Sequence, residues 1–279
     1  LTVLLGLPLA FFFARYTFPF KTLIKAVATL PFVLPTIVVA MGFLSLLGPQ
    51  GIANTVLMYI FNLSAPPIEV TNSLTIIFMA HVFYNCAIVV RIVSAVWSNL
   101  DPSIEETACM LGAGPIKIFY RITLPLLAPA LISSALLTFA FSFTSFGIVL
   151  ILGGSQFATM EVAIFELTAK LFRLPLAAAL SIIQLIFTYV TLLMYSKFQE
   201  QTVVHLTPKP REATIRRNLL LWDKLFMAGM AVILMALLSP LIALLIRSLS
   251  FDDGHVATHV TNLFSNDRGS YFYLSPLKI

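Results

Sequence analysis

Side chains that could do chemistry are sparse in this sequence, and three of them lie together in an apolar run. His81, Tyr84 and Asn85 are separated by three and four residues, a spacing that places them on one face of a helix. Gln184 lies in a later apolar run. Such groups could line a polar path, or they could hydrogen-bond between helices, because polar groups within a bilayer need partners. We favour hydrogen bonding and keep path lining as the alternative.

These residues do not complete a catalytic set. An intramembrane enzyme would need a nucleophile with a base, or a group of metal ligands, but His81 is the only histidine in an apolar run. The sequence contains no H-E-x-x-H, no G-x-S-x-G and no G-x-x-x-x-G-K-[ST] phosphate loop. We therefore predict no enzyme activity and no catalytic, cofactor-binding or metal-binding residues.

The composition is that of a membrane protein. Hydrophobic residues make up 59% of the chain and charged residues only 10%, whereas soluble domains carry about 25% charged residues. We expect an all-α, polytopic bundle of transmembrane helices whose surroundings are the lipid bilayer. The net charge of +5 does not indicate a nucleic-acid partner, because basic residues of membrane proteins gather in cytoplasmic loops.

A polar stretch at residues 101–125 separates two apolar runs, Leu74 to Val96 and Leu126 to Leu152, each long enough to cross a bilayer. Asp101 can cap a helix that has Pro102 at its first position. In an alternative register, Ser103 and Glu106 have the spacing of a capping box.

The same stretch contains signals for a turn. Gly112 and Gly114 are expected to end the first helix, with Gly112 at a position where a positive φ is needed, and Pro115 to begin a second helix. The pattern predicts a short helix-turn-helix on the membrane surface, which by itself could be an ordinary helical hairpin.

This stretch resembles the EAA loop of bacterial ABC-importer permeases of the type I kind. The anchors of the resemblance, at the family's separations, are Glu106, Thr107, Ala108, Gly112, Ile122, Leu124 and Pro125. Thr107 stands where the family more often has alanine. The resemblance implies that the loop is a cytoplasmic coupling helix that docks on an ABC ATPase subunit dimer, which binds the ATP. It further implies an extracytoplasmic solute-binding protein and a multi-pass location in the bacterial inner membrane.

Apolar runs and basic residues predict the topology. Arg15, Lys21 and Lys25 mark one side as cytoplasmic, and the EAA-like loop should lie on the same side. The predicted membrane-crossing runs are a remnant at Leu1 to Ala14, then Leu23 to Leu47, Leu74 to Val96, Leu126 to Leu152, Leu174 to Tyr195 and Phe226 to Leu245.

Three stretches resemble the fused permeases for iron(III) and thiamine, in which two halves share one polypeptide: Leu34 to Gly51, Ala80 to Asn85, and Ser145 to Gly154 with its continuation to Ile164. The resemblance implies a first permease half at residues 1–197, a cytoplasmic linker at 198–224 and the start of a second half at 225–279. We expect the sequence to be a piece of a longer chain, with a second EAA-like loop beyond it, and iron(III) or thiamine as the solute.

The main alternative is a secondary transporter driven by an ion gradient. Such a transporter would usually carry acidic residues within its spans for ion coupling, and it would not need an EAA-like loop. The ABC-importer hypothesis therefore fits the sequence better.

Overall fold

The computed structural model describes residues 1–154, 156–204 and 221–249, and every regular element in these ranges is helical. The elements are α1 (Thr2–Arg15), α2 (Lys21–Val33), α3 (Thr36–Leu47), α4 (Ile52–Phe61), α5 (Leu74–Trp97), α6 (Pro102–Met110), α7 (Pro115–Ile118), η1 (Phe119–Thr123), α8 (Leu124–Phe143), α9 (Gly147–Leu152), α10 (Met160–Phe165), η2 (Glu166–Lys170), α11 (Leu174–Val204) and α12 (Leu221–Leu249).

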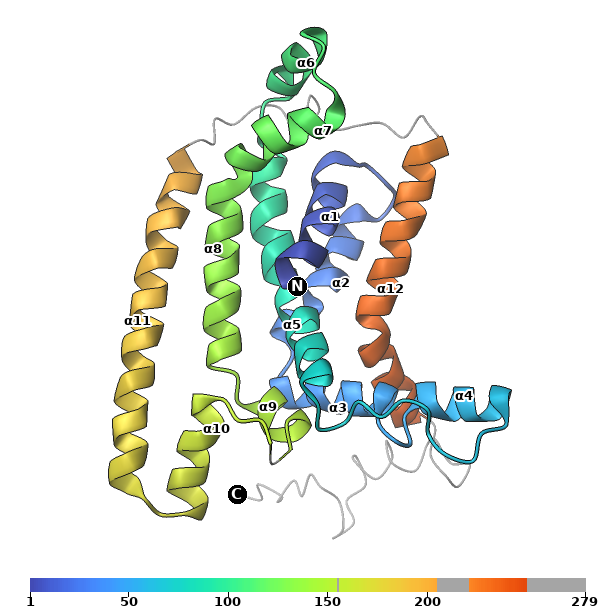
Figure 1. Cartoon of the computed structure of the whole chain (residues 1–279). Helices are drawn as coiled ribbons and strands as arrows, with labels where there is room; N and C mark the ends of the chain where they lie inside the picture. Colours follow the sequence, from blue (N-terminus) through green and yellow to red (C-terminus); the bar gives the residue numbers. More distant parts are fainter. Residues whose placement is uncertain (155, 205–220, 250–279) are drawn as a thin grey trace, which may run out of the picture.

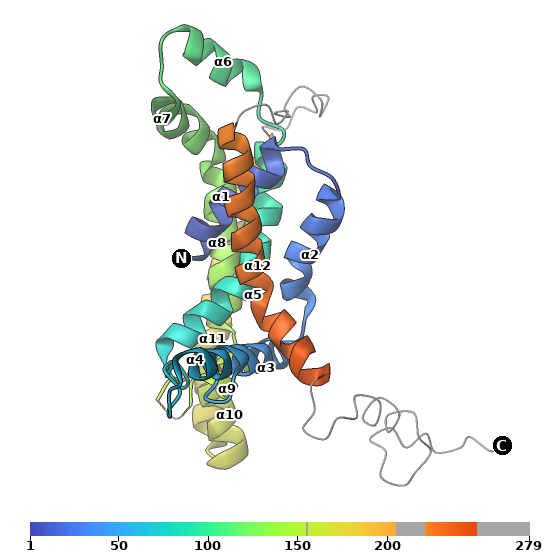
Figure 2. The same ribbon diagram turned by 90° about the vertical axis from the view of Figure 1, so that its right-hand side faces the viewer.

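Helix α5 is the centre of the bundle. Ser73 caps it, with the side-chain oxygen accepting from the Ile76 N–H. It packs against α1, α2 and α8, while α8 also packs against α11, and α12 packs against α1 and α3. Figures 1 and 2 show α11 and α12 on the two flanks of this group. The long apolar run from Leu74 is thus the most buried of the candidate membrane spans among the described residues.

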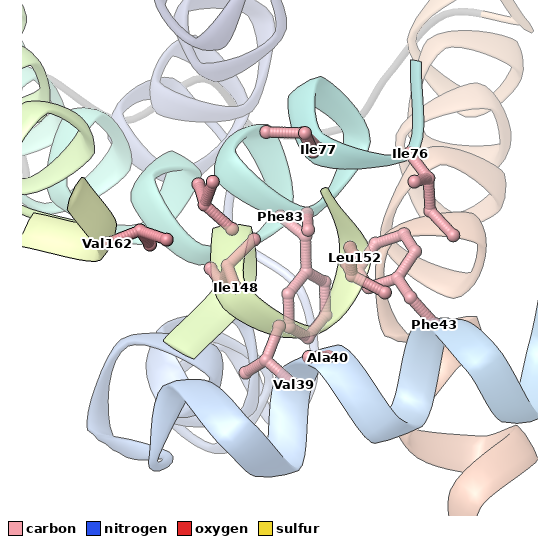
Figure 3. Close-up of a cluster of buried hydrophobic side chains, with 11 residues drawn as sticks. Val39, Ala40, Phe43, Ile76, Ile77, Phe83, Ile148, Leu152 and Val162 are labelled. Atoms are coloured by element: carbon pink, nitrogen blue, oxygen red, sulfur yellow. The ribbon is translucent and has the colours of Figure 1, made fainter. Parts of the chain in front are cut away.

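The largest buried apolar cluster joins four elements at one end of the bundle. Phe43 of α3, Phe83 of α5, Leu152 of α9 and Val162 of α10 are all nearly inaccessible to solvent. Figure 3 shows Phe43 and Phe83 with the neighbouring side chains of this cluster, and the two rings meet edge to face with centroids 5.6 Å apart. This cluster fixes α3 and α9 against the first turns of α5.

The predicted span from Leu23 to Leu47 is wrong, because two helices occupy it. Helix α2 ends at Val33, Leu34 and Pro35 are extended (ψ of 145° and 136°), and α3 begins at Thr36. Pro35 has no N–H to donate, and its ring disfavours a helical conformation at Leu34. Figure 1 shows the result: α2 runs along the bundle, whereas α3 and α4 cross its end.

Two other predicted boundaries also need correction. The run from Leu126 to Leu152 divides into α8 and α9, with the break at Thr144 and Ser145. There the Thr144 hydroxyl donates to Ala140 O (3.0 Å), and Ser145 O accepts from the Thr159 hydroxyl (2.7 Å), so side chains stabilise the broken backbone. Helix α11 continues to Val204, beyond both the predicted end of its span at Tyr195 and the predicted start of the linker at 198.

Within the described residues, five stretches are long and apolar enough to cross a membrane: Thr36–Phe61, Leu74–Trp97, Pro115–Phe143, Leu174–Glu200 and Lys224–Arg247. The last of these packs on the first half of the chain, since Met230 and Leu234 lie in one buried cluster with Leu9 and Phe12 of α1. The division into two fused halves stays a prediction, and residues 205–220 and 250–279 lie outside the described ranges.

Candidate functional site

The predicted helix-turn-helix forms a hairpin of α6 and α7 that projects beyond one end of the bundle (Figures 1 and 2). Of the two N-caps that the sequence allows, the structure uses Asp101. Its Oδ1 accepts from the Ser103 N–H (3.1 Å), and Pro102 occupies the first helical position. Ser103 is therefore inside the helix, and the alternative capping box with Glu106 does not form.

The turn of the hairpin confirms the expected role of Gly112. Its φ is +82°, and the N–H groups of Gly112 and Ala113 donate to Cys109 O (2.9 Å) and Ala108 O (3.0 Å). This pair of bonds is the Schellman arrangement that closes many helices with a left-handed glycine. Gly114 then caps the second helix, which begins at Pro115 as predicted.

The second helix joins the following span without a break. Between α7 and α8 lies the π-helical turn η1, directly before Leu124 and Pro125. A proline in this position has no N–H for the carbonyl of Arg121, and a widened turn lets the helix pass it. Ile122, Leu124 and Pro125 thus lie where the hairpin enters the bundle, and movement of the hairpin would bear directly on α8.

The hairpin is joined to the bundle by a group that the sequence reading missed. Arg15, at the end of α1, forms an ion pair with Glu105 of α6 (Nη2 to Oε2, 2.9 Å). The Thr123 hydroxyl of η1 donates to the other oxygen of Glu105 (2.8 Å). The Arg15 side chain is only 5% exposed and that of Glu105 26%. Carboxylate, guanidinium and hydroxyl therefore connect three elements at the root of the hairpin.

The outer face of the α6–α7 hairpin is exposed to solvent. Glu106 and Thr107 are exposed and Ala108 is half-buried, with the Thr107 hydroxyl bonded back to Ser103 O (2.7 Å). Large apolar side chains are also exposed here, although this segment extends beyond the bundle: Ile104, Met110, Leu111, Ile116 and Tyr120. An exposed apolar surface outside the lipid-facing part of a molecule indicates a protein-binding surface.

The polar residues of α5 do not form one lining. Asn85 is fully buried and donates to the Ser142 hydroxyl of α8 (3.1 Å), a bond between helices. His81 Nδ1 lies 2.8 Å from Ile77 O of its own helix, and the Tyr84 ring contacts that of Phe32. Asn85, His81 and Tyr84 therefore each make a contact within or between helices, as helix packing would predict.

Gln184 lies apart from these three residues. Its Nε2 donates to Glu161 Oε1 of α10 (2.6 Å), and both side chains line a cavity of about 590 Å³ between α8, α10 and α11. The structure therefore does not bring Gln184 together with the α5 group.

Comparison with known proteins places this geometry in a family. Residues 6–203 match the family model described as the binding-protein-dependent transport system inner membrane component. The chain belongs to this family. The hairpin, at residues 102–118, lies within the matched region.

Curated relatives of this permease include transport proteins for several small solutes. It is 35% identical over 191 residues, 68% of this chain and 67% of the relative, to the sulfate transport system permease protein CysT of Salmonella typhimurium. It is 31% identical over 169 residues, 60% of this chain and 73% of the relative, to the molybdenum transport system permease protein ModB of Azotobacter vinelandii. A putative 2-aminoethylphosphonate transport system permease protein, PhnU of Salmonella typhi, is 28% identical over 164 residues, 59% of this chain and 57% of the relative.

A solved structure has the same fold. The permease superimposes on a chain of a bacterial ABC transporter involved in the import of the acidic polysaccharide alginate, with a TM-score of 0.54 and 17% identity over 73% of this chain and 71% of that one. Family membership makes the chain a multi-pass inner-membrane permease subunit of a binding-protein-dependent ABC importer. Such a subunit hydrolyses no ATP itself: a separate ATPase binds the nucleotide, and a periplasmic binding protein delivers the solute.

Only part of this site could have been found from the sequence. The spacing of its glycines and prolines predicted the hairpin correctly. Arg15, Glu105 and Thr123 were missed because they are far apart in the chain, and the only local signal was a charged residue at the end of an apolar run.

Proposed function

We propose that this permease carries a small tetrahedral oxyanion, of the class of sulfate, molybdate or a phosphonate, across the inner membrane. The observation that supports this proposal is the set of relatives: sulfate, molybdenum and 2-aminoethylphosphonate permeases all resemble this chain over more than half of its length. Their solutes differ in size and element but share a compact group of oxygen atoms with negative charge. A path for one of them needs donors and positive charge rather than carboxylates.

This proposal replaces the expectation that the solute is iron(III) or thiamine. Both are cationic solutes, and none of the relatives named above carries either of them in its name. The three stretches that resembled the iron(III) and thiamine permeases lie at α3, in α5 and at α9 with α10, the elements that form the largest buried apolar cluster. They therefore carry information about the fold more than about the solute.

Uptake measurements test the solute class. Cells with and without this permease would be compared for uptake of labelled sulfate, molybdate, 2-aminoethylphosphonate, iron(III) and thiamine at equal external concentration. We expect loss of permease to lower the uptake of at least one oxyanion and to leave iron(III) and thiamine unchanged. Loss of iron(III) or thiamine uptake with normal oxyanion uptake would contradict the proposal.

We further infer that the α6–α7 hairpin docks on the ATPase and faces the cytoplasm. The support is geometric: an exposed apolar surface with Met110 90% and Leu111 83% exposed lies next to the exposed carboxylate of Glu106, on a hairpin whose root is fixed to α1 and η1. An element that projects from the bundle and is fixed at its root can transmit movement between a docked partner and the transmembrane helices. Ile122 and Leu124 connect it to α8.

The coupling role predicts that Glu106→Lys and Gly112→Asp abolish solute-stimulated ATP hydrolysis while insertion is retained. Lysine reverses the charge offered to the partner. At Gly112 an added Cβ meets no atom within 4 Å, so the local cost is the positive φ, about 1 kcal/mol. ATPase co-purification and ATP hydrolysis would be measured in membranes with equal permease.

Two control variants accompany these measurements. Glu200→Lys makes the same charge change on an exposed residue outside the hairpin, and Gly114→Asp adds a carboxylate where φ is −69° and space is open. The first should leave coupling intact and the second should impair it less than Gly112→Asp. Wild-type ATPase binding and stimulation in both test variants would exclude the hairpin as the coupling element.

A further inference from the structure

A cavity of about 730 Å³ lies between α2, α5, α8 and α11, and the α5 residues that line it, between Ala87 and Ala95, belong to the half of this helix that leads to the hairpin. Its walls combine apolar side chains with a group of polar and basic ones. The polar and basic lining residues are Thr22, Lys25, Thr29, Arg91, Tyr195 and Gln199. None of the described residues that line it carries a carboxylate.

Arg91 is the decisive member of this group. It lies in the span Leu74–Trp97, six residues before its end, which corresponds to about 9 Å along the helix. It is exposed and forms no ion pair within the described residues. Charged groups inside a span are costly, and those that persist face a partner or a water-filled cavity. Arg91 faces the cavity.

Lys25 reaches the same cavity from α2. Its ammonium donates to the Ser94 hydroxyl of α5 (2.9 Å), and Ser94 is 1% exposed. Ser94 follows Arg91 by three residues, so both lie on the same face of α5. The bond to Ser94 therefore holds the lysine head group near the arginine, and Thr22 and Thr29 line the cavity from the same helix as Lys25.

We propose that this cavity binds a tetrahedral oxyanion, with Arg91 as the principal ligand and Lys25 as a second positive charge. A guanidinium presents two parallel N–H groups that match two oxygens of an oxyanion, and an ammonium adds a point charge without fixed direction. The absence of carboxylates among the described lining residues removes the group that would repel such a ligand. Its place beside the hairpin end makes it a site on the cytoplasmic part of the path.

The inference rests on the proposed function in naming the solute as the occupant. The same chemistry is present in the phosphate of a phospholipid head group, which could enter from the surrounding membrane. A transported oxyanion should bind in neutral lipid and be displaced by other small oxyanions. A head group should be retained through purification and should exclude sulfate.

Binding of labelled sulfate would be measured on the permease with its ATPase in nanodiscs of phosphatidylcholine, without binding protein. We expect saturable binding that molybdate displaces, weakened by about ten- to a hundredfold in Arg91→Gln and in Lys25→Gln, because hydrogen bonds to charged groups are of this strength. Arg91→Lys keeps the charge and should recover part of the affinity. Arg173→Gln removes an exposed arginine at the other end of the bundle and should bind as wild type.

The possible results separate the two proposals. Wild-type affinity in Arg91→Gln and Lys25→Gln would overturn the site, whereas sulfate uptake by cells with wild-type permease would leave the proposed function standing. If the wild-type permease binds no sulfate but co-purifies with phosphatidylglycerol, and Arg91→Gln loses this lipid, the occupant of the cavity is a head group. The assignment of the cavity to the transported solute is then overturned. Co-purification of each variant with the ATPase in wild-type amount shows that it is folded.

Discussion

At the scale of single residues, two adjacent glutamates of α6 have different surroundings. Glu105 is joined to the buried guanidinium of Arg15 and to the Thr123 hydroxyl, whereas Glu106 is exposed. Removing one partner of a largely buried ion pair leaves the other charge without compensation, and this cost exceeds the net gain of forming the pair. We therefore expect Glu105 to act in stability and Glu106 in partner binding.

Glu105→Gln tests this division. It should lower the free energy of unfolding by about 1–2 kcal/mol, a modest value because water reaches part of the carboxylate. Thermal unfolding of the detergent-solubilised permease would be compared with that of Glu106→Gln, which changes the neighbouring residue in the same way. Glu106→Gln should unfold at the wild-type temperature but bind the ATPase less well. Equal unfolding temperatures for the two variants would show that the ion pair is not what stabilises the hairpin root.

At the scale of elements, the sequence predicted correctly those structures that depend on neighbouring residues, such as helix caps and turns. The hairpin follows from an aspartate cap, a left-handed glycine and a proline at a helix start, all within a few residues of one another. The break at Pro35 lies inside the run from Leu23 to Leu47, which was predicted as one span. A proline in the interior of a helix weakens it, but the cluster of Phe43 with Phe83 determines the direction in which the chain continues.

The same limit applies to the candidate sites. Lys25 was interpreted as a marker of the cytoplasmic side, and neither Lys25 nor Arg91 has a partner close in sequence that would indicate a cavity. The cavity exists because α2 separates from α3 and packs against α5, a tertiary event. Conversely, Gln184 was grouped with the polar residues of α5 because it too lies in an apolar run, but its side chain bonds to Glu161 of α10.

The bond between Asn85 and Ser142 makes a prediction about the α5–α8 contact. Asn85→Ala should lower stability by roughly 0.6 kcal/mol and leave solute preference unchanged, because interhelical hydrogen bonds in membranes average about this value. His81→Ala removes a contact within one helix and serves as the comparison. Ser142→Ala in the Asn85→Ala background should add little further loss. A normal unfolding temperature together with altered solute preference would instead favour path lining by Asn85.

At the scale of the whole molecule, the two ends of the bundle differ in charge. The hairpin end carries most of the described basic residues: Arg15, Lys21, Lys25, Lys117, Arg121, Lys197 and Lys224. The end with α4, α9 and α10 carries Lys170, Arg173 and, at the end of α12, Arg247, and Lys170 is paired there with Glu166 (3.0 Å). An excess of lysine and arginine marks the cytoplasmic side of a membrane protein. The charge distribution therefore supports the proposal that the hairpin faces the cytoplasm.

Reporter fusions test this orientation together with the fold. Fusions at Thr17 and Gly114 should give a cytoplasmic signal, because both lie in segments at the hairpin end, and fusions at Pro66 and Gln156 an external signal, because both lie in segments at the opposite end. Thr207 and Gly254, which lie outside the described residues, are expected to be cytoplasmic and external. At each position two reporters would be fused, one active only in the cytoplasm and one active only outside. The signal of one reporter then shows that a silent partner fusion is expressed. A cytoplasmic signal at Pro66 with an unchanged signal at Gly114 would contradict the placement of α4 opposite the hairpin. Reversal at all sites would leave the fold intact and would place the hairpin outside the cell, where it could not meet an ATPase.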